Sequence, residues 1–221
     1  EQLSYGACAL CGEQKIAKRS VSKHLSGCPK TIPSGHNKKA LHLLVWFPYD
    51  KRYWLNCEAD ESTGLRTLDA FLRNIWLECC GHMSAFTVAQ RTYQHPGGAM
   101  RAKLNDLLLP GMRFSYEYDF GSTTELMLDV LEHDAAKAAG GPVRLLALND
   151  PPHYRCSTCR NPATTLCLEC QEGMEGTEDE PKMFFCDGCI DTASMHPHDD
   201  EAMRLPVVNS PRMGVCGYTG E

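Results

Sequence analysis

Eight cysteine and histidine residues between positions 156 and 198 constrain this chain more than any other feature. They form three Cys-x2-Cys pairs and one His-x-His pair, separated by seven, fifteen and six residues. A structural Zn²⁺ takes four Cys or His ligands in a tetrahedron, and a pair of cysteines on a tight turn can place both sulfurs on one ion. Free core cysteines would rarely produce three such pairs by chance. The residues are Cys156, Cys159, Cys167, Cys170, Cys186, Cys189, His196 and His198. Eight ligands predict two zinc ions.

The order of these pairs resembles that of the B-box and related cross-brace domains. In those domains the first and third pairs hold one ion, and the second and fourth pairs hold the other. The resemblance implies a first site of Cys156, Cys159, Cys186 and Cys189, and a second site of Cys167, Cys170, His196 and His198. The alternative is a sequential arrangement, in which the first two pairs together form one four-cysteine site.

A third predicted zinc site lies near the start of the chain. The pattern Cys8-x2-Cys11-x12-His24-x3-Cys28 has the spacing of a zinc finger whose last ligand is cysteine. The first two cysteines would lie on a tight turn. His24 and Cys28 are four residues apart, so they would share one face of a short helix. We therefore predict a Cys-Cys-His-Cys zinc finger over residues 1–37 and three zinc ions in the whole chain.

The N-terminal region is basic, although the chain as a whole carries a net charge of −6. Residues 1–40 hold seven basic and two acidic side chains. The finger positions that would read DNA bases fall at Ala17, Ser20 and Lys23, and the first two are too short for bidentate base contacts. Lys18, Arg19 and Lys23 can instead contact phosphates without reading sequence. Nucleic acid is thus a candidate partner, and a solvated basic face on a structural finger is the alternative.

The central region, residues 38–150, predicts an α+β domain with one principal helix on a mixed sheet. Thr67 is a candidate N-cap, and apolar residues then recur every three or four positions from Leu68 to Cys79, which gives one apolar helix face. Apolar or alternating runs of strand length surround this helix. We predict strands at residues 41–47, 53–58, 85–88, 92–95, 113–118, 124–131 and 143–148.

Two segments of this region resemble a known family. Residues 104–126, LNDLLLPGMRFSYEYDFGSTTEL, and residues 67–88, TLDAFLRNIWLECCGHMSAFTV, are similar to the plasmid pRiA4b ORF-three-like family. Its members occur in bacterial mobile elements and are often labelled insertion-element passenger or resolvase-like proteins. The resemblance covers most of residues 40–132 and implies the fold of the domain and a mobile-element or defence context.

Cys79, Cys80 and His82 are the one group in the central region with the residue types for chemistry. A thiolate beside a histidine can act as a nucleophile or bind a metal ion. Cys79 falls on the apolar face of the helix, and free cysteines are often buried, so we expect core packing. The alternatives are a further metal or thiol site and an enzyme active site.

The remaining residues, 151–221, follow the boundary Asp150-Pro151-Pro152 and carry twelve acidic and five basic side chains. An acidic zinc module is better suited to a protein partner than to nucleic acid. We expect a B-box-like cross-brace domain with a packed C-terminal tail. This domain and the zinc finger would be two small zinc-stabilised domains that flank the central domain.

The compartment and the function class follow from the same features. Paired cysteines with histidines favour metal binding in a reducing cytoplasm over disulfides. No run approaches the roughly 18 apolar residues of a membrane span. We predict a cytoplasmic zinc-binding scaffold or adaptor that binds a protein or nucleic acid. The alternative is an enzyme with a Cys/His or zinc active site around Cys79, Cys80 and His82.

Overall fold

The computed structural model describes residues 4–30, 40–131, 140–172, 183–192, 196 and 198–220. The chain divides into two compact units, Glu1–Asp150 and Pro151–Glu221. No helix of the described residues is both long and apolar enough to cross a membrane. The division falls at the Asp150-Pro151 boundary that the sequence indicates.

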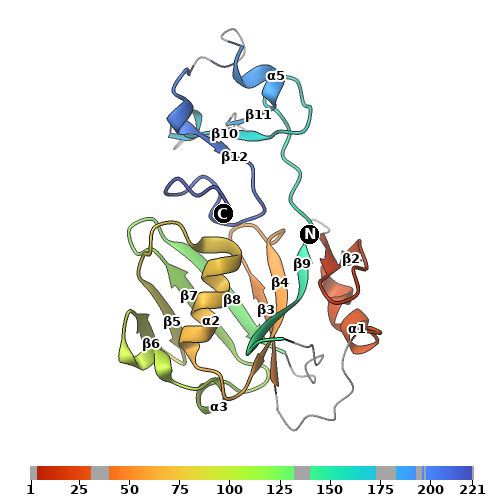
Figure 1. Cartoon of the computed structure of the whole chain (residues 1–221), viewed down its shortest axis with the longest axis vertical. Coiled ribbons are helices and arrows are strands. Elements are labelled where there is room, and N and C mark those ends of the chain that lie inside the picture. Colours follow the sequence, from red (N-terminus) through yellow and green to blue (C-terminus); the bar gives the residue numbers. More distant parts are fainter. Residues whose placement is uncertain are drawn as a thin grey trace. The chain divides into compact units, whose positions relative to one another are not determined.

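The first unit is built around one large antiparallel sheet (Figure 1). Its described strands are β1 Tyr5–Cys8, β2 Ile16–Ala17, β3 Ala40–Trp46, β4 Trp54–Asp60, β5 Ser84–Val88, β6 Arg91–His95, β7 Arg113–Tyr118, β8 Thr124–Val130 and β9 Val143–Asn149. Their order in the sheet is β2-β1-β9-β4-β3-β8-β7-β5-β6. The sequence predicts a mixed sheet, but all pairings of the described strands are antiparallel. The sheet and its few helices make an α+β protein, and the seven strands predicted in the central region are present with ends shifted by at most two residues.

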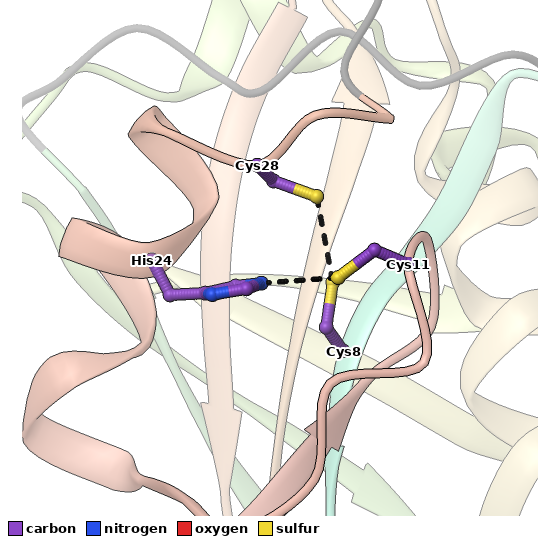
Figure 2. Close-up of side chains that lie close together, drawn as sticks. All are labelled: Cys8, Cys11, His24 and Cys28. Carbon is purple, nitrogen blue, oxygen red and sulfur yellow. Dashed lines mark hydrogen bonds between the residues drawn. The ribbon is translucent and has the colours of Figure 1, made fainter.

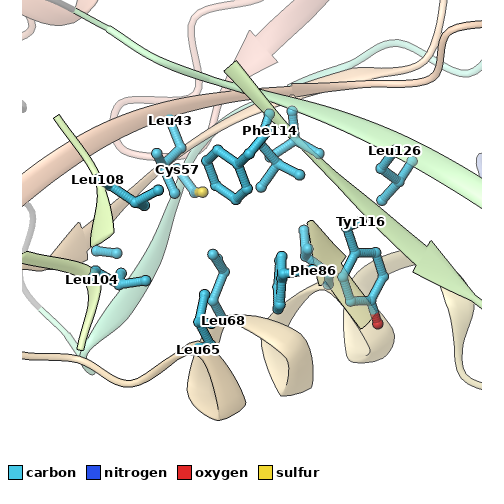
Figure 3. Packing of buried hydrophobic residues seen from close by; sticks show 14 of the residues in the cluster. Leu43, Cys57, Leu65, Leu68, Phe86, Leu104, Leu108, Phe114, Tyr116 and Leu126 are labelled. Atoms are coloured by element: carbon cyan, nitrogen blue, oxygen red, sulfur yellow. The ribbon is translucent and has the colours of Figure 1, made fainter. Parts of the chain in front are cut away.

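One helix covers a face of this sheet and forms the main core with it. The helix α2 is Leu65–Leu72 and continues into a π-helical turn, Arg73–Leu77. Figure 3 shows Leu65 and Leu68 pointing from the helix toward the strands of the sheet, in the same buried cluster as Phe86 of β5. Each fully buried side chain of this size contributes about 1.5–3 kcal/mol, so this contact holds the unit together. The short helix α3 is Leu104–Leu107.

The helix starts before the residue that the sequence suggests. Thr67 was the candidate N-cap, but α2 begins at Leu65 and its N-cap is Gly64. The Gly64 carbonyl accepts from the Thr67 N–H at 3.0 Å, which places Thr67 inside the first turn. Leu65 is fully buried and its N–H donates to the Ala102 carbonyl at 3.0 Å. Tertiary contacts at Leu65 therefore override the local capping preference.

The N-terminal segment extends the large sheet. Strand β1 pairs with β9, and the helix α1, Val21–Ser26, places its Val21 and Leu25 in one buried cluster with Trp54 of β4. Gly6 allows this close approach, because a Cβ there would collide with the Leu148 carbonyl and would lie 2.8 Å from the Trp54 ring. Residues 4–30 therefore belong to the first compact unit and share its core.

The second unit contains a small sheet and two short helices. Its strands β10 Thr165–Cys167, β11 Phe184–Phe185 and β12 Arg204–Pro206 are antiparallel in the order β11-β10-β12, and its helices are α4 Leu168–Glu172 and α5 Asp187–Ile190. One of its two apolar clusters has three buried members, Leu166, Phe184 and Leu205, against which Val207 and Met213 of the C-terminal tail pack. A core of this size gives little stability by itself.

Candidate metal sites

The first group of possible ligands lies where β1 meets α1 (Figure 2). Cys8 ends β1, His24 is on α1, and Cys28 follows that helix. The Sγ atoms of Cys8 and Cys28 are 3.9 Å apart, and Cys11 Sγ lies 3.4 Å from His24 Nε2. All four ligand atoms lie within 4.8 Å of one another. The sequence-predicted set Cys8, Cys11, His24 and Cys28 is thus brought together, and it could hold a metal ion.

Local backbone geometry sets up this first group. The Cys8 carbonyl accepts from the Gly12 N–H at 3.0 Å, and Gly12 has a φ of 78°, so the chain turns tightly after Cys8 and Cys11. Burial raises the pKa of Cys8 to about 11, whereas the Glu13 backbone N–H lowers the pKa of Cys11. The thiols therefore differ in how readily they ionise, and a bound cation would favour the thiolate of both.

The second group contains four cysteines of the second unit. Cys156 and Cys189 are buried, and the Sγ atoms of Cys159 and Cys186 are 3.5 Å apart. All four sulfurs lie within 4.8 Å of one another. The turn at Cys156 resembles the one at Cys8: the Arg160 N–H donates to the Cys156 carbonyl at 3.0 Å, and Arg160 has a φ of 65°.

The electrostatics of this group suit a cation. Burial acts to raise the pKa of Cys156, but N–H groups of Cys159, Cys186 and Thr158 donate to its sulfur and lower the pKa to about 6. Burial and, to a smaller extent, the neighbouring cysteines together raise the pKa of Cys189 to about 12. Once one of these thiols is ionised, its negative charge makes ionisation of a second thiol costly unless a positive ion lies between them. A divalent cation satisfies that requirement, and zinc prefers such thiolate sets.

The third group joins two cysteines and two histidines of the second unit. Cys167 ends β10 and Cys170 lies on α4. Their Sγ atoms are 3.6 and 3.3 Å from His198 Nδ1. His196 completes the group, and its ligand atom lies within 4.8 Å of the other three. A metal ion could be held here by two sulfurs and two imidazoles.

His196 gives a further sign that the third group fits a metal ion. Its ring is buried, and its Nδ1 lies 3.0 Å from the Ile190 carbonyl oxygen. Its Nε2 is also buried and has no hydrogen-bond partner among the residues that the structure describes. A buried nitrogen without a partner is costly, and metal coordination at Nε2 removes that cost. A histidine that donates Nδ1–H to a carbonyl is also the usual form of a zinc ligand.

The two groups of the second unit are paired crosswise. The first and third Cys-x2-Cys pairs are together, and the second pair is with the two histidines. This is the grouping of the cross-brace arrangement, whereas the sequential alternative would join the first two Cys-x2-Cys pairs. The small sheet supports this crosswise grouping of the ligand pairs. Its strand β10 pairs with β11, which brings residues 165–166 beside residues 184–185.

A fourth group of possible ligands includes Cys79, Cys80 and His82 of the first unit. Cys79 packs against the main core, as the sequence indicates. Cys80 is exposed and His82 is partly exposed, so core packing accounts for only one of the three. Their ligand atoms lie within 4.8 Å of one another. In all, four Cys/His groups among the described residues could hold metal ions, and their donors are compatible with zinc.

The basic side chains of the N-terminal segment divide into two kinds. Lys18 Nζ lies 5.7 Å from the centre of the Trp46 ring and donates to the Lys51 carbonyl. Arg19 and Lys23 are exposed. Of the three side chains predicted to contact phosphates, Arg19 and Lys23 are therefore the ones presented to solvent.

Comparison with known proteins adds little to these findings. No family model matches the chain, and no curated protein matches it. Among solved structures, it is similar to MM3350 from Methanosarcina mazei Go1, which is described as a protein of unknown function. That similarity covers 50% of this chain and 68% of the other, with 18% sequence identity and a TM-score of 0.41. A similarity at this level shows neither a family nor an activity for this chain.

Proposed function

We propose that the protein is a zinc-binding scaffold that carries three structural zinc ions. The supporting observation is that three groups each bring four Cys or His ligand atoms within 4.8 Å of one another. Four protein ligands complete a tetrahedral zinc site, whereas a catalytic zinc keeps a position for water or substrate. Complete sets therefore support a structural role for these three sites.

The scaffold would present its two units to different partners. The second unit is acidic, which suits a protein partner. The first unit presents Arg19 and Lys23 beside the first zinc site, where they can contact a nucleic-acid backbone. The resemblance of residues 67–88 and 104–126 to the pRiA4b ORF-three-like family supports a bacterial mobile-element or defence context.

Zinc counting by native mass spectrometry tests the scaffold. One ligand of each group is replaced in turn, by Cys11→Ser, Cys159→Ser and Cys170→Ser, and each variant should hold one zinc ion fewer than the wild-type chain. Cys57→Ala is the matched control, because Cys57 is buried in the main core and belongs to none of the four groups. Burial raises the pKa of Cys57, so it is a poor ligand. A folded wild-type chain with fewer than three zinc ions would refute the proposal.

A further inference from the structure

The helix α2 and its π-helical continuation end just before two cysteines, Cys79 and Cys80. Its last residues form a π-helical turn, in which the Glu78 N–H donates to the Arg73 carbonyl at 2.8 Å. Such turns insert one extra residue and often occur at functional sites. After this turn the chain leaves the helix at Glu78, and Cys79 and Cys80 follow. Cys80 is consequently directed to solvent and not to the core.

Two side chains hold the segment from Cys79 to His82 in a tight turn. The Tyr118 hydroxyl oxygen lies 3.4 Å from the N–H groups of both Cys79 and His82, so it contacts the two ends of the segment. Glu78 Oε1 accepts from the Gly81 N–H at 2.6 Å, and Gly81 has a φ of 73°, which suits glycine. The two cysteines and the histidine are therefore pre-positioned by the fold.

Glu78 and Tyr118 are themselves fixed. Glu78 Oε2 accepts from Arg73 Nε at 2.6 Å, and its Oε1 accepts from the Tyr118 hydroxyl at 3.1 Å. The Arg73 guanidinium also lies over the Tyr118 ring, 5.1 Å from its centre. A network of this kind limits the movement of the turn that it supports.

The carboxylate of Asp119 lies beside the imidazole ring of His82. Asp119 Oδ1 lies 3.6 Å from His82 Nδ1, and Asp119 is buried with a φ of 63°. Asp119 is held there because its Oδ1 accepts from the Gly121 N–H at 3.0 Å. A carboxylate beside Nδ1 is the common second partner of a zinc-binding histidine, and it directs Nε2 toward the metal.

We propose that Cys79, Cys80 and His82 form a further zinc site in the first unit, beyond the three sites of the scaffold. The two sulfurs and the imidazole lie within 4.8 Å of one another. Such ligands favour binding of zinc over binding of magnesium or calcium. Core packing explains the position of Cys79 but not the convergence of exposed Cys80 and His82 on it. A zinc ion held by these three side chains takes one more ligand, either water or another side chain.

Zinc counting on the 221-residue chain gives the first test. The double variant Cys80→Ser/His82→Ala should hold one zinc ion fewer than the wild-type chain, and Cys57→Ala should hold the same number. A folded double variant that keeps the wild-type number would overturn the proposal. The three scaffold sites are tested by their own variants, Cys11→Ser, Cys159→Ser and Cys170→Ser, so a failure there is distinguishable from a failure here.

Alkylation of the wild-type chain gives a second test that needs no variant. Trypsin cleaves after Arg73 and Arg91, and the peptide of residues 74–91 contains Cys79 and Cys80 and no other cysteine. In reducing buffer, zinc should protect this peptide from iodoacetamide, and a chelator should make both thiols reactive. Exposed Cys80 would react at the same rate with and without chelator if no metal were bound, and that result would overturn the proposal.

Asp119→Asn tests the positioning role of the carboxylate. Asparagine tolerates the positive φ and can still accept from the Gly121 N–H, but it removes the charge beside His82. Loss of a second partner of this kind typically lowers zinc affinity by about 10–100-fold. The peptide of residues 74–91 should therefore become reactive at a lower chelator concentration than in the wild-type chain. An unchanged chelator concentration would exclude this role for Asp119.

Discussion

Cys159 Sγ lies 3.5 Å from Cys186 Sγ, although the two residues are 27 positions apart in the chain. Closing a loop of this length costs conformational entropy, and the small sheet of the second unit supplies only a few buried apolar side chains in return. A zinc ion shared by the two cysteines would offset that cost. The contact therefore connects the cross-brace pairing to the stability of the unit.

The pairing can be checked by the alkylation pattern of one variant. Cys159→Ser removes a ligand from the four-cysteine group, so the thiols of Cys186 and Cys189 should become reactive. Cys167 and Cys170 belong to the other group and should stay protected. Trypsin separates these two pairs onto the peptides of residues 183–204 and 161–182. A sequential arrangement predicts the opposite pattern, in which the peptide of residues 161–182 becomes reactive and the other stays protected.

Removal of zinc should affect the two units unequally. The first unit buries a large apolar core between α2 and the sheet, whereas one of the two clusters in the second unit consists mostly of cysteines. Because the zinc-binding energy of a small domain is also folding energy, a strong chelator should unfold the second unit. Hydrogen exchange should then rise in β10, β11 and β12 and stay slow in β3, β4, β7 and β8.

Tryptophan fluorescence gives an independent check of this prediction. All three tryptophans, Trp46, Trp54 and Trp76, lie in the first unit. A cooperative thermal transition should therefore remain visible by fluorescence in the presence of chelator. Its complete loss would show that the first unit also needs metal to fold, contrary to the burial pattern of its core.

The sequence predicts the central sheet well because its strands obey simple burial rules. Strand β8 alternates buried and partly exposed residues along its whole length, and the predicted range differs from the observed one by a single residue. The helix face was predicted for the same reason: Leu68, Leu72 and Trp76 recur at helical spacing and are all fully buried.

The features that sequence did not predict depend on contacts between distant segments. Pairing of β1 with β9 joins residues near positions 7 and 148, and no local pattern specifies it. The position of Asp119 beside His82 likewise depends on the pairing of β5 with β7. In the sequence, Asp119 is only a turn residue before Phe120-Gly121. The available clue to this contact is that Asp119 directly follows β7, and β7 pairs with β5, the strand that begins after His82.

Nucleic-acid binding can be tested at the N-terminal segment. The double variant Arg19→Ala/Lys23→Ala should weaken binding to duplex DNA of any sequence, because these side chains would contact phosphates. Each lost contact should reduce the slope of log affinity against log salt by about 0.9. The double variant Arg101→Ala/Lys103→Ala is a matched control, since both side chains are also exposed but lie outside the N-terminal segment. Equal losses in the two variants, measured by fluorescence anisotropy, would argue against a dedicated interface.

A buried ion pair connects β9 to β4. Glu58 is fully buried, and its Oε1 accepts from Arg144 Nε at 2.6 Å, while Arg144 Nη2 donates to Asp60 Oδ1 at 2.8 Å. Arg144→Ala would leave a buried carboxylate without its cation, which typically costs about 3–5 kcal/mol. Urea unfolding followed by tryptophan fluorescence should show this loss of stability.

Arg113→Ala is the control for that measurement. Arg113 pairs with Asp129, but its side chain is 59% exposed, so the variant should lose at most about 1 kcal/mol. Replacing both members of the buried pair, as Glu58→Leu/Arg144→Met, should recover most of the stability lost in Arg144→Ala, because no charge then remains buried without a partner. A double variant less stable than Arg144→Ala would mean that the ion pair stabilises the pairing of β9 with β4 by more than mutual neutralisation.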